Sequence, residues 1–154
     1  MRKPFLSGLL VATLLTFPAF LAPATAEENV TSTPVTVYKS PWCGCCGGWI
    51  DHMRAAGFTV EVNDLENLDP VKRAMGVPEQ LESCHTASVG GYTTEGHVPA
   101  SEVIRLLTEK PAARGLSVPG MVVGSPGMEQ GNAYEPYAVV LFSDARRPIV
   151  YRQY

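Results

Sequence analysis

The sequence predicts a single α/β domain in which helices flank a mixed central sheet. Short runs that alternate apolar and polar residues, a pattern typical of half-buried strands, are separated by segments whose apolar residues recur at helical spacing. The expected order of elements is β-α-β-α-β-β-α, followed by a long Gly/Pro/Met loop and two last strands. Because the order begins β-α-β, we expect the first two strands to be parallel.

The first 26 residues have the features of a signal peptide. Arg2 and Lys3 precede an apolar run over residues 5–21, and Ala24-Thr25-Ala26 has the small-residue pattern that signal peptidase recognises. We expect cleavage near Ala26, export to the periplasm and no membrane attachment afterwards. A retained anchor is the alternative, but prolines interrupt the run, which is shorter than the roughly 20 apolar residues that cross a bilayer.

Residues 27–34 are polar and lack periodicity, so we expect a flexible leader there. Residues 35–154 have the length of one ordinary domain with a proper core. The chain carries a formal net charge of −3 and no basic run. Nucleic acid is therefore not an expected partner, whereas a mildly acidic surface is compatible with cations.

The first half of the expected domain consists of a strand, a cysteine-rich turn, a helix and a second strand. Residues 35–38 alternate like a strand, and Pro41 favours a break before the cysteines. Gly57 lies where a helix C-cap is expected, and residues 58–62 alternate again. The apolar residues at helical spacing between the strands are Trp49, Ile50, Met53 and Phe58.

A short helix, a hairpin and a third helix are expected next. The short helix covers residues 68–75, and the hairpin joins residues 84–89 to 92–95 through Gly90-Gly91. Pro99 opens the third helix.

The composition then changes. Residues 115–129 show neither the alternation of a strand nor the apolar spacing of a helix, and they contain several Gly and Pro residues. We therefore expect a long ordered loop. Residues 137–142 and 148–151 complete the chain as two strands.

Four cysteines follow the signal peptide, and the default interpretation for an exported protein is two disulfides. Their spacing argues against it. A bridge between the neighbours Cys45 and Cys46 needs a strained ring, and Cys43 with Cys46 has the C-x-x-C spacing of redox and metal sites. Three thiols in four positions therefore indicate a chemical site.

The turn Trp42-Cys43-Gly44-Cys45-Cys46 between a strand and a helix resembles the active site of the thioredoxin superfamily. The resemblance implies a thioredoxin-like fold. The departure is Cys45, a third thiol where thioredoxin itself has proline. A third thiolate suits a metal better than a dithiol switch, because its negative charge needs a cation. We expect Trp42 and Trp49 to shield the sulfurs or pack in the core.

Thiolate and thioether ligands select Cu(I), with Zn(II) as the main competitor. In thioredoxin-like folds the start of the third strand lies beside the active-site turn, so Cys84 and His85 are expected to join the first three thiols. More candidates than the four ligands of zinc are present, which favours copper, with several ions per chain as an option. The candidate metal ligands are Cys43, Cys45, Cys46, Cys84, His85, His97 and Met121.

Several of these residues have an alternative interpretation. His97 can instead form a hydrogen bond at the start of the third helix, and Met121 and Met128 can fill apolar gaps. His52 lies on the cysteine face of its helix, and can support a ligand or face solvent. The sequence leaves the roles of His52 and Met128 open.

Five segments together resemble the CopG family of bacterial periplasmic copper-resistance proteins. They are Tyr38-Lys39-Ser40-Pro41-Trp42-Cys43-Gly44-Cys45-Cys46, Ser83-Cys84-His85-Thr86-Ala87, Gly90-Gly91-Tyr92, Glu95-Gly96-His97-Val98-Pro99, and Val118-Pro119-Gly120-Met121 through Gly124-Ser125-Pro126-Gly127-Met128-Glu129. The resemblance implies a thioredoxin-like fold with a cysteine-bridged multi-copper site and a role in copper redox interchange. One departure is Val122, where we expect the family often to have proline.

We therefore expect a periplasmic copper-resistance protein that holds Cu(I) and can interconvert Cu(I) and Cu(II), in exchange with other periplasmic copper-handling proteins. Whether it is a copper oxidoreductase or a storage protein stays open. The alternative is a thiol–disulfide oxidoreductase with Cys43 as nucleophile and Cys46 as resolving thiol. Val77-Pro78 would then be the loop proline, although that proline is expected directly before the third strand. A disulfide-stapled binding module is a third option.

Overall fold

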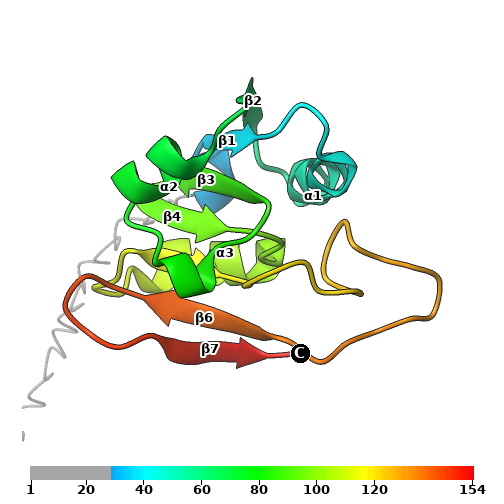
Figure 1. Cartoon of the computed structure of the whole chain (residues 1–154). Coiled ribbons are helices and arrows are strands. Elements are labelled where there is room, and N and C mark those ends of the chain that lie inside the picture. Colours follow the sequence, from blue (N-terminus) through cyan, green and yellow to red (C-terminus); the bar gives the residue numbers. More distant parts are fainter. Residues whose placement is uncertain (1–28) are drawn as a thin grey trace, which may run out of the picture.

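The computed structural model describes residues 29–154 and contains one seven-stranded mixed sheet with helices packed against it (Figure 1). The expected signal peptide and its cleavage site lie outside the described residues. The strand order is β2-β1-β3-β4-β5-β6-β7. The strands are β1 Val35–Lys39, β2 Val60–Asp64, β3 His85–Val89, β4 Tyr92–Glu95, β5 Gly115–Ser117, β6 Ala138–Phe142 and β7 Ile149–Gln153. The helices are α1 Gly44–Ala55, α2 Asp69–Ala74 and α3 Ala100–Glu109, with 3-10 turns η1 Val30–Ser32 and η2 Glu79–Leu81. The expected fold class is confirmed.

Strand β1 is parallel to β2 and antiparallel to β3, as the β-α-β order and the hairpin predict. Strand β2 begins two residues later than expected. Gly57 adopts a φ of +96° at the end of α1, and the Phe58 N–H still donates to the Met53 carbonyl. Phe58 is therefore part of the helix end, and its side chain is buried in the core.

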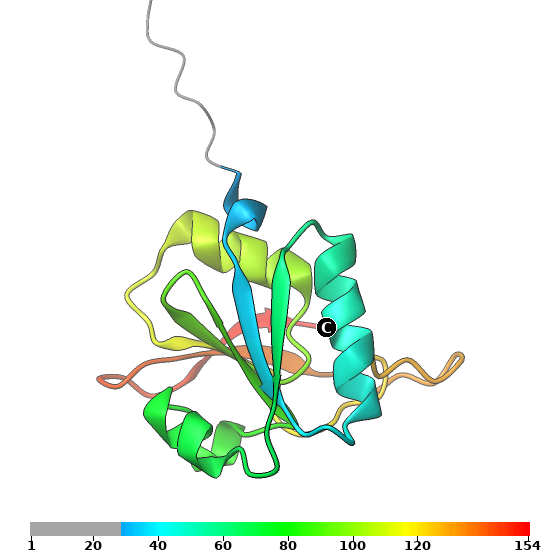
Figure 2. The same cartoon turned by 90° about the horizontal axis from the view of Figure 1, so that it is seen from above.

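The hydrophobic core lies between the sheet and two helices. Helix α1 contributes Trp49, Ile50 and Met53, and α3 contributes Val103, Leu106 and Leu107 to the same buried cluster. Helix α2 lies on the other side of β1 and β3 from α1 in Figure 1, and Figure 2 shows it apart from both α1 and α3. The two faces of the sheet are thus covered by different helices.

Two segments differ from the expectations. Residues 115–117, expected as the start of a long loop, form β5, which is parallel to β4 and antiparallel to β6. All three are buried, so no polar alternation marks the strand. Residues 30–32 of the expected flexible leader form η1, which Asn29 caps with its side chain and whose Val30 packs against the core.

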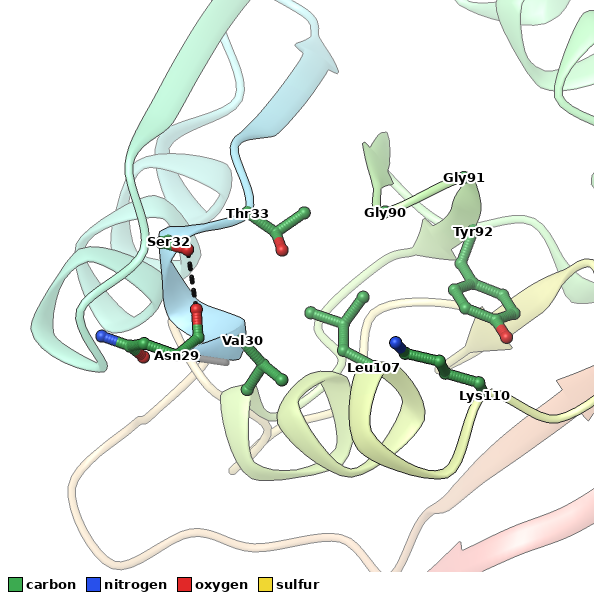
Figure 3. A pocket seen from close by; sticks show the side chains of 9 residues that line it. All are labelled: Asn29, Val30, Ser32, Thr33, Gly90, Gly91, Tyr92, Leu107 and Lys110. Atoms are coloured by element: carbon green, nitrogen blue, oxygen red, sulfur yellow. Dashed lines mark hydrogen bonds between the residues drawn. The ribbon is translucent and has the colours of Figure 1, made fainter. Parts of the chain in front are cut away.

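A cavity of about 320 Å³ lies between η1, the β3–β4 turn and the end of α3 (Figure 3). Thr33 and Gly90 line it, next to Val35 and Val89, which pair at one end of β1 and β3. The cysteine-rich turn follows the other end of β1. None of the helices between residues 29 and 154 has both the length and the apolar character that a bilayer crossing requires.

Candidate metal centre

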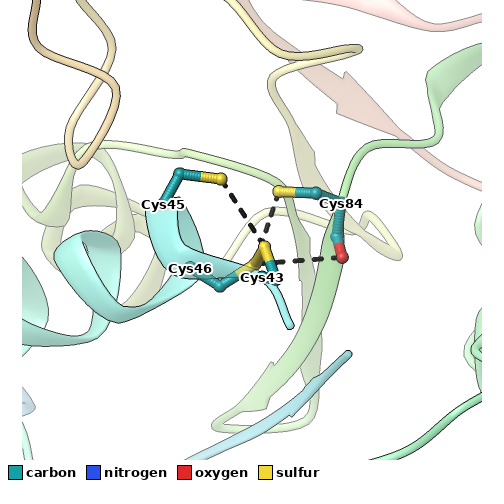
Figure 4. A group of neighbouring side chains, drawn as sticks. All are labelled: Cys43, Cys45, Cys46 and Cys84. Atoms are coloured by element: carbon teal, nitrogen blue, oxygen red, sulfur yellow. Dashed lines mark hydrogen bonds between the residues drawn. A yellow bond between two sulfur atoms is a disulfide. The ribbon is translucent and has the colours of Figure 1, made fainter. Parts of the chain in front are cut away.

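Four sulfur atoms lie close together where β1 ends and β3 begins (Figure 4). Cys43 is the N-cap of α1, Cys45 and Cys46 lie in its first turn, and Cys84 directly precedes β3. Lys39 pairs with His85, so the residues after β1 and before β3 emerge side by side. The four Sγ atoms all lie within 4.8 Å of one another. The structure thus brings together the four cysteines that the sequence singles out.

Cys43 and Cys46 are joined by a disulfide, whereas Cys45 and Cys84 are free. The C-x-x-C spacing places the two Cα atoms 5.4 Å apart on one helical turn, inside the ordinary range for a disulfide. Each sulfur of the bridge has a free thiol beside it, with Cys45 Sγ 3.5 Å from Cys43 Sγ and Cys84 Sγ 3.6 Å from Cys46 Sγ. All four cysteines are predicted metal ligands, and the two bridged sulfurs are not free to bind as thiolates. Their role as ligands stays a prediction.

Cys84 also belongs to a second group, formed with His85 and His97, whose ligand atoms again lie within 4.8 Å of one another. Cys84 Sγ lies 3.0 Å from His97 Nε2 and 3.4 Å from His85 Nδ1. His97 Nδ1 lies 2.7 Å from the Pro126 carbonyl, which can only accept, so Nδ1 carries the proton. The Nε2 lone pair of His97 therefore points at the thiol.

Burial controls the protonation of this second group. Burial raises the pKa of the Cys84 thiol to about 12, and the neighbouring Cys45 acts in the same direction. Burial also lowers the pKa values of His85 and His97. The metal-free group therefore holds a protonated thiol beside two neutral imidazoles. A metal ion would release the thiol proton and find both imidazoles already deprotonated.

His85 is fully buried on the α1 side of the sheet, with its ring centroid 4.5 Å from that of Trp49. Its Nε2 atom is buried and has no hydrogen-bond partner among the described residues. A buried imidazole nitrogen without a partner is costly in a purely structural role. The surroundings of His85 thus fit a functional role better than a purely structural one.

The long loop closes over the cysteine-rich turn of α1. A Cβ atom built on Gly127 would lie 2.4 Å from Trp49 N and 2.8 Å from Cys45 O, so only glycine fits at this contact. Gly127 also adopts a φ of +83°, a conformation that favours glycine. Pro126, the preceding residue, supplies the carbonyl that orients His97. The loop, which the sequence predicts to be ordered, is therefore part of the site's framework.

Other candidates have different positions. His52 Nε2 accepts the Ala100 N–H at the start of α3, so His52 links two helices. Met121 is 57 % exposed, although the neighbouring Gly120 pairs with Ser83 beside the cluster. Its role as a ligand stays a prediction. Met128 is half-buried in the loop. Trp49 is fully buried and donates to the Val98 carbonyl, as expected for a core residue.

Trp42 departs from the expectation that it shields the sulfurs or packs in the core, because 76 % of it is exposed. A further feature that the sequence did not reveal is a buried ion pair between Lys72 of α2 and Glu95 of β4, on the opposite face of the sheet. A lysine in a short polar helix carries no local signal of burial.

The chain is similar to known proteins in both sequence and structure. The family model described as "Protein of unknown function, DUF411" matches residues 81–128. A comparison with curated proteins gave no significant match. Two solved structures, described as "Copper resistance protein copG", forms 1 and 2, are each 39 % identical to this chain with a TM-score of 0.76. Each match covers 80 % of this chain and 98 % of the solved one. The chain therefore belongs to the CopG family of copper resistance proteins.

Proposed function

We propose that this protein binds Cu(I) in the periplasm through Cys43, Cys45, Cys46 and Cys84, as part of copper resistance. The observation that carries the proposal is the convergence of four sulfur atoms within 4.8 Å, in a chain whose solved relatives are copper resistance proteins. Soft thiolate ligands select Cu(I) over the hard cations.

The number of donors favours copper over zinc. A structural zinc site closes with four ligands in a tetrahedron. Here two groups of donors share Cys84, and two buried imidazoles adjoin the four sulfurs. A shared thiolate can bridge two ions, so we propose a site that holds more than one Cu(I).

The imidazoles supply what interconversion of Cu(I) and Cu(II) needs. Thiolates alone stabilise Cu(I), whereas imidazole nitrogen suits both oxidation states. His97 presents Nε2 to Cys84 in a fixed tautomer, and His85 Nδ1 lies 3.4 Å from the same sulfur. We therefore propose that the Cys84 side of the site supports the change in oxidation state.

The disulfide sets the capacity of the site. With Cys43 and Cys46 bridged, only two of the four sulfurs can bind as thiolates. Two electrons and two protons from a dithiol reductant cleave the bridge and yield two thiols. We expect the reduced protein to bind more Cu(I) than the oxidised protein does.

Metal analysis of protein purified from copper-supplemented cells tests the proposal. We expect at least one copper per chain in reduced wild-type protein. Cys84→Ser, which removes the donor common to both groups, should lose most of that copper. His52→Gln is the matched control, because it changes a half-buried histidine outside both groups. Zinc in place of copper, with less than one copper per chain, would exclude the copper site.

A second candidate function is thiol–disulfide exchange, which the Cys43–Cys46 disulfide at the start of α1 supports. Cys84, and not a proline, occupies the position directly before β3. Insulin reduction by the metal-free protein separates the two functions. Brisk turnover that depends on Cys43 would favour the oxidoreductase.

A further inference from the structure

The ion pair between Lys72 and Glu95 is buried far more deeply than an ordinary surface pair. The relative exposure is 4 % for Lys72 and zero for Glu95, and the ammonium contacts Glu95 Oε1 directly. Removing two charges from water is expensive, so such a pair persists only when further hydrogen bonds satisfy both groups. The location of those hydrogen bonds therefore indicates what the pair does.

The remaining hydrogen bonds of the pair go to Ser83 and Thr86. Lys72 Nζ donates to the Ser83 carbonyl at 3.0 Å and lies 3.2 Å from Thr86 Oγ1. Glu95 accepts the Ser83 N–H and the Thr86 hydroxyl, each at 2.6 Å. The N–H and the C=O of Ser83 are thus held by opposite charges. Ser83 and Thr86 are the residues on either side of Cys84-His85.

Strand alternation keeps the ion pair away from the ligand atoms. His85 points toward Trp49 of α1, so the next residue, Thr86, points toward α2 on the opposite face. The pair therefore holds the backbone on either side of Cys84 and His85 through hydrogen bonds on the α2 face of the sheet. Ser83 Oγ adds a third link, because it donates to the Gly120 carbonyl of the loop segment.

We propose that Lys72 and Glu95 are positioning residues for Cys84, the sulfur that both donor groups share. The inference rests on the proposed copper function. The position of the Ser83 peptide determines the position of the Cys84 Cβ atom. Cys84 Sγ contacts both Cys46 Sγ and His97 Nε2, so its side chain has to be placed accurately. Supporting residues that orient metal ligands typically change affinity about 10- to 100-fold when they are removed.

The double variant Lys72→Met/Glu95→Gln tests the proposal, because it removes both charges and keeps the side-chain volumes. We expect Cu(I) affinity, measured by competition with a chelator, to fall about tenfold. In metal-free protein we expect the alkylation rate of Cys84, mapped by mass spectrometry, to change as well. This second readout needs no copper.

Two controls separate positioning from stability. Arg105→Met/Glu109→Gln makes the same chemical change at the exposed 2.8 Å ion pair on α3 and should alter neither readout. Val103→Ala lowers stability through the core of α3 and should leave copper affinity in place. Equal loss of affinity in Val103→Ala at matched stability would overturn the positioning role.

Thr86→Val removes one hydroxyl of the network and replaces the double variant if that variant does not fold. We expect smaller changes in the same two readouts. If wild-type protein binds copper and the folded variant matches it in affinity and alkylation rate, the positioning inference is wrong. If wild-type protein binds no copper, the proposed function fails, and the alkylation rates still decide the role of the pair.

Discussion

The contact between the long loop and α1 can be tested by adding one methyl group at Gly48. Gly47 and Gly48 are neighbours in α1, and alanine is favoured over glycine in a helix by about 1 kcal/mol. A Cβ atom on Gly47 meets nothing within 4 Å. We therefore expect Gly47→Ala to raise the free energy of unfolding by about 0.5–1 kcal/mol, equivalent to roughly 3 °C in Tm.

At Gly48 the same methyl group meets the loop. Its Cβ would lie 2.9 Å from Gly127 Cα and 3.3 Å from Gly127 O, and these backbone atoms cannot rotate away. Overpacking of this kind costs about 1–3 kcal/mol, which offsets or exceeds the gain in helix propensity. We expect Gly48→Ala to be less stable than Gly47→Ala by about 1–3 kcal/mol.

Urea unfolding of the oxidised, metal-free protein, followed by tryptophan fluorescence, measures this difference. Copper retention is the second assay, because the loop also supplies the Pro126 carbonyl that orients His97. Gly48→Ala should retain less copper against a chelator, whereas Gly47→Ala should match wild type. If the two variants are equally stable, the loop does not pack on α1 as described, and the argument from Gly127 is wrong.

Three further predictions concern single side chains. Cys45→Ser should lower the copper content per chain, measured by elemental analysis, while circular dichroism shows an intact fold; unchanged copper would mean that the third thiol is not a ligand. Burial lowers the pKa of His52 below its ordinary value of 6.5, so the folded state binds fewer protons than the unfolded state below that pH. The metal-free protein should lose stability from about pH 7 to about pH 5, and His52→Gln should flatten that slope in pH-dependent unfolding; parallel slopes would contradict this origin. Trp49→Phe removes the donor to the buried Val98 carbonyl and should cost about 1–3 kcal/mol in urea unfolding, whereas the exposed Trp42→Phe should have little effect, and equal costs would refute the assignment.

Much of the fold follows from local patterns. Alternation over residues 35–38, helical spacing through Met53 and the Gly90-Gly91 turn predicted the mixed sheet and its first connections, because each pattern reflects which side of one element is buried. Strand β5 was missed because such patterns appear only where one side of a strand is exposed. All three of its residues are buried, so its sequence carries no alternation.

The candidate site divides in the same way. The spacing of Cys43, Cys45 and Cys46 identified a chemical site without structural information, because three thiols on one helical turn must be neighbours. The pairing of Lys39 with His85 in the sheet brings Cys84 to the same sulfurs. Register of this kind depends on contacts between residues distant in the sequence.

By itself the sequence determined the order of the helices and of every strand except β5, the cysteine motif and the soft character of the proposed ligands. The tertiary structure decided that Cys43 and Cys46 are bridged, that His52 links helices, and that Lys72 lies buried behind the site. These features depend on strand register and on loop and helix packing across the whole domain. Local periodicity reports which face of an element is buried, but it carries no information about which distant residue meets that face.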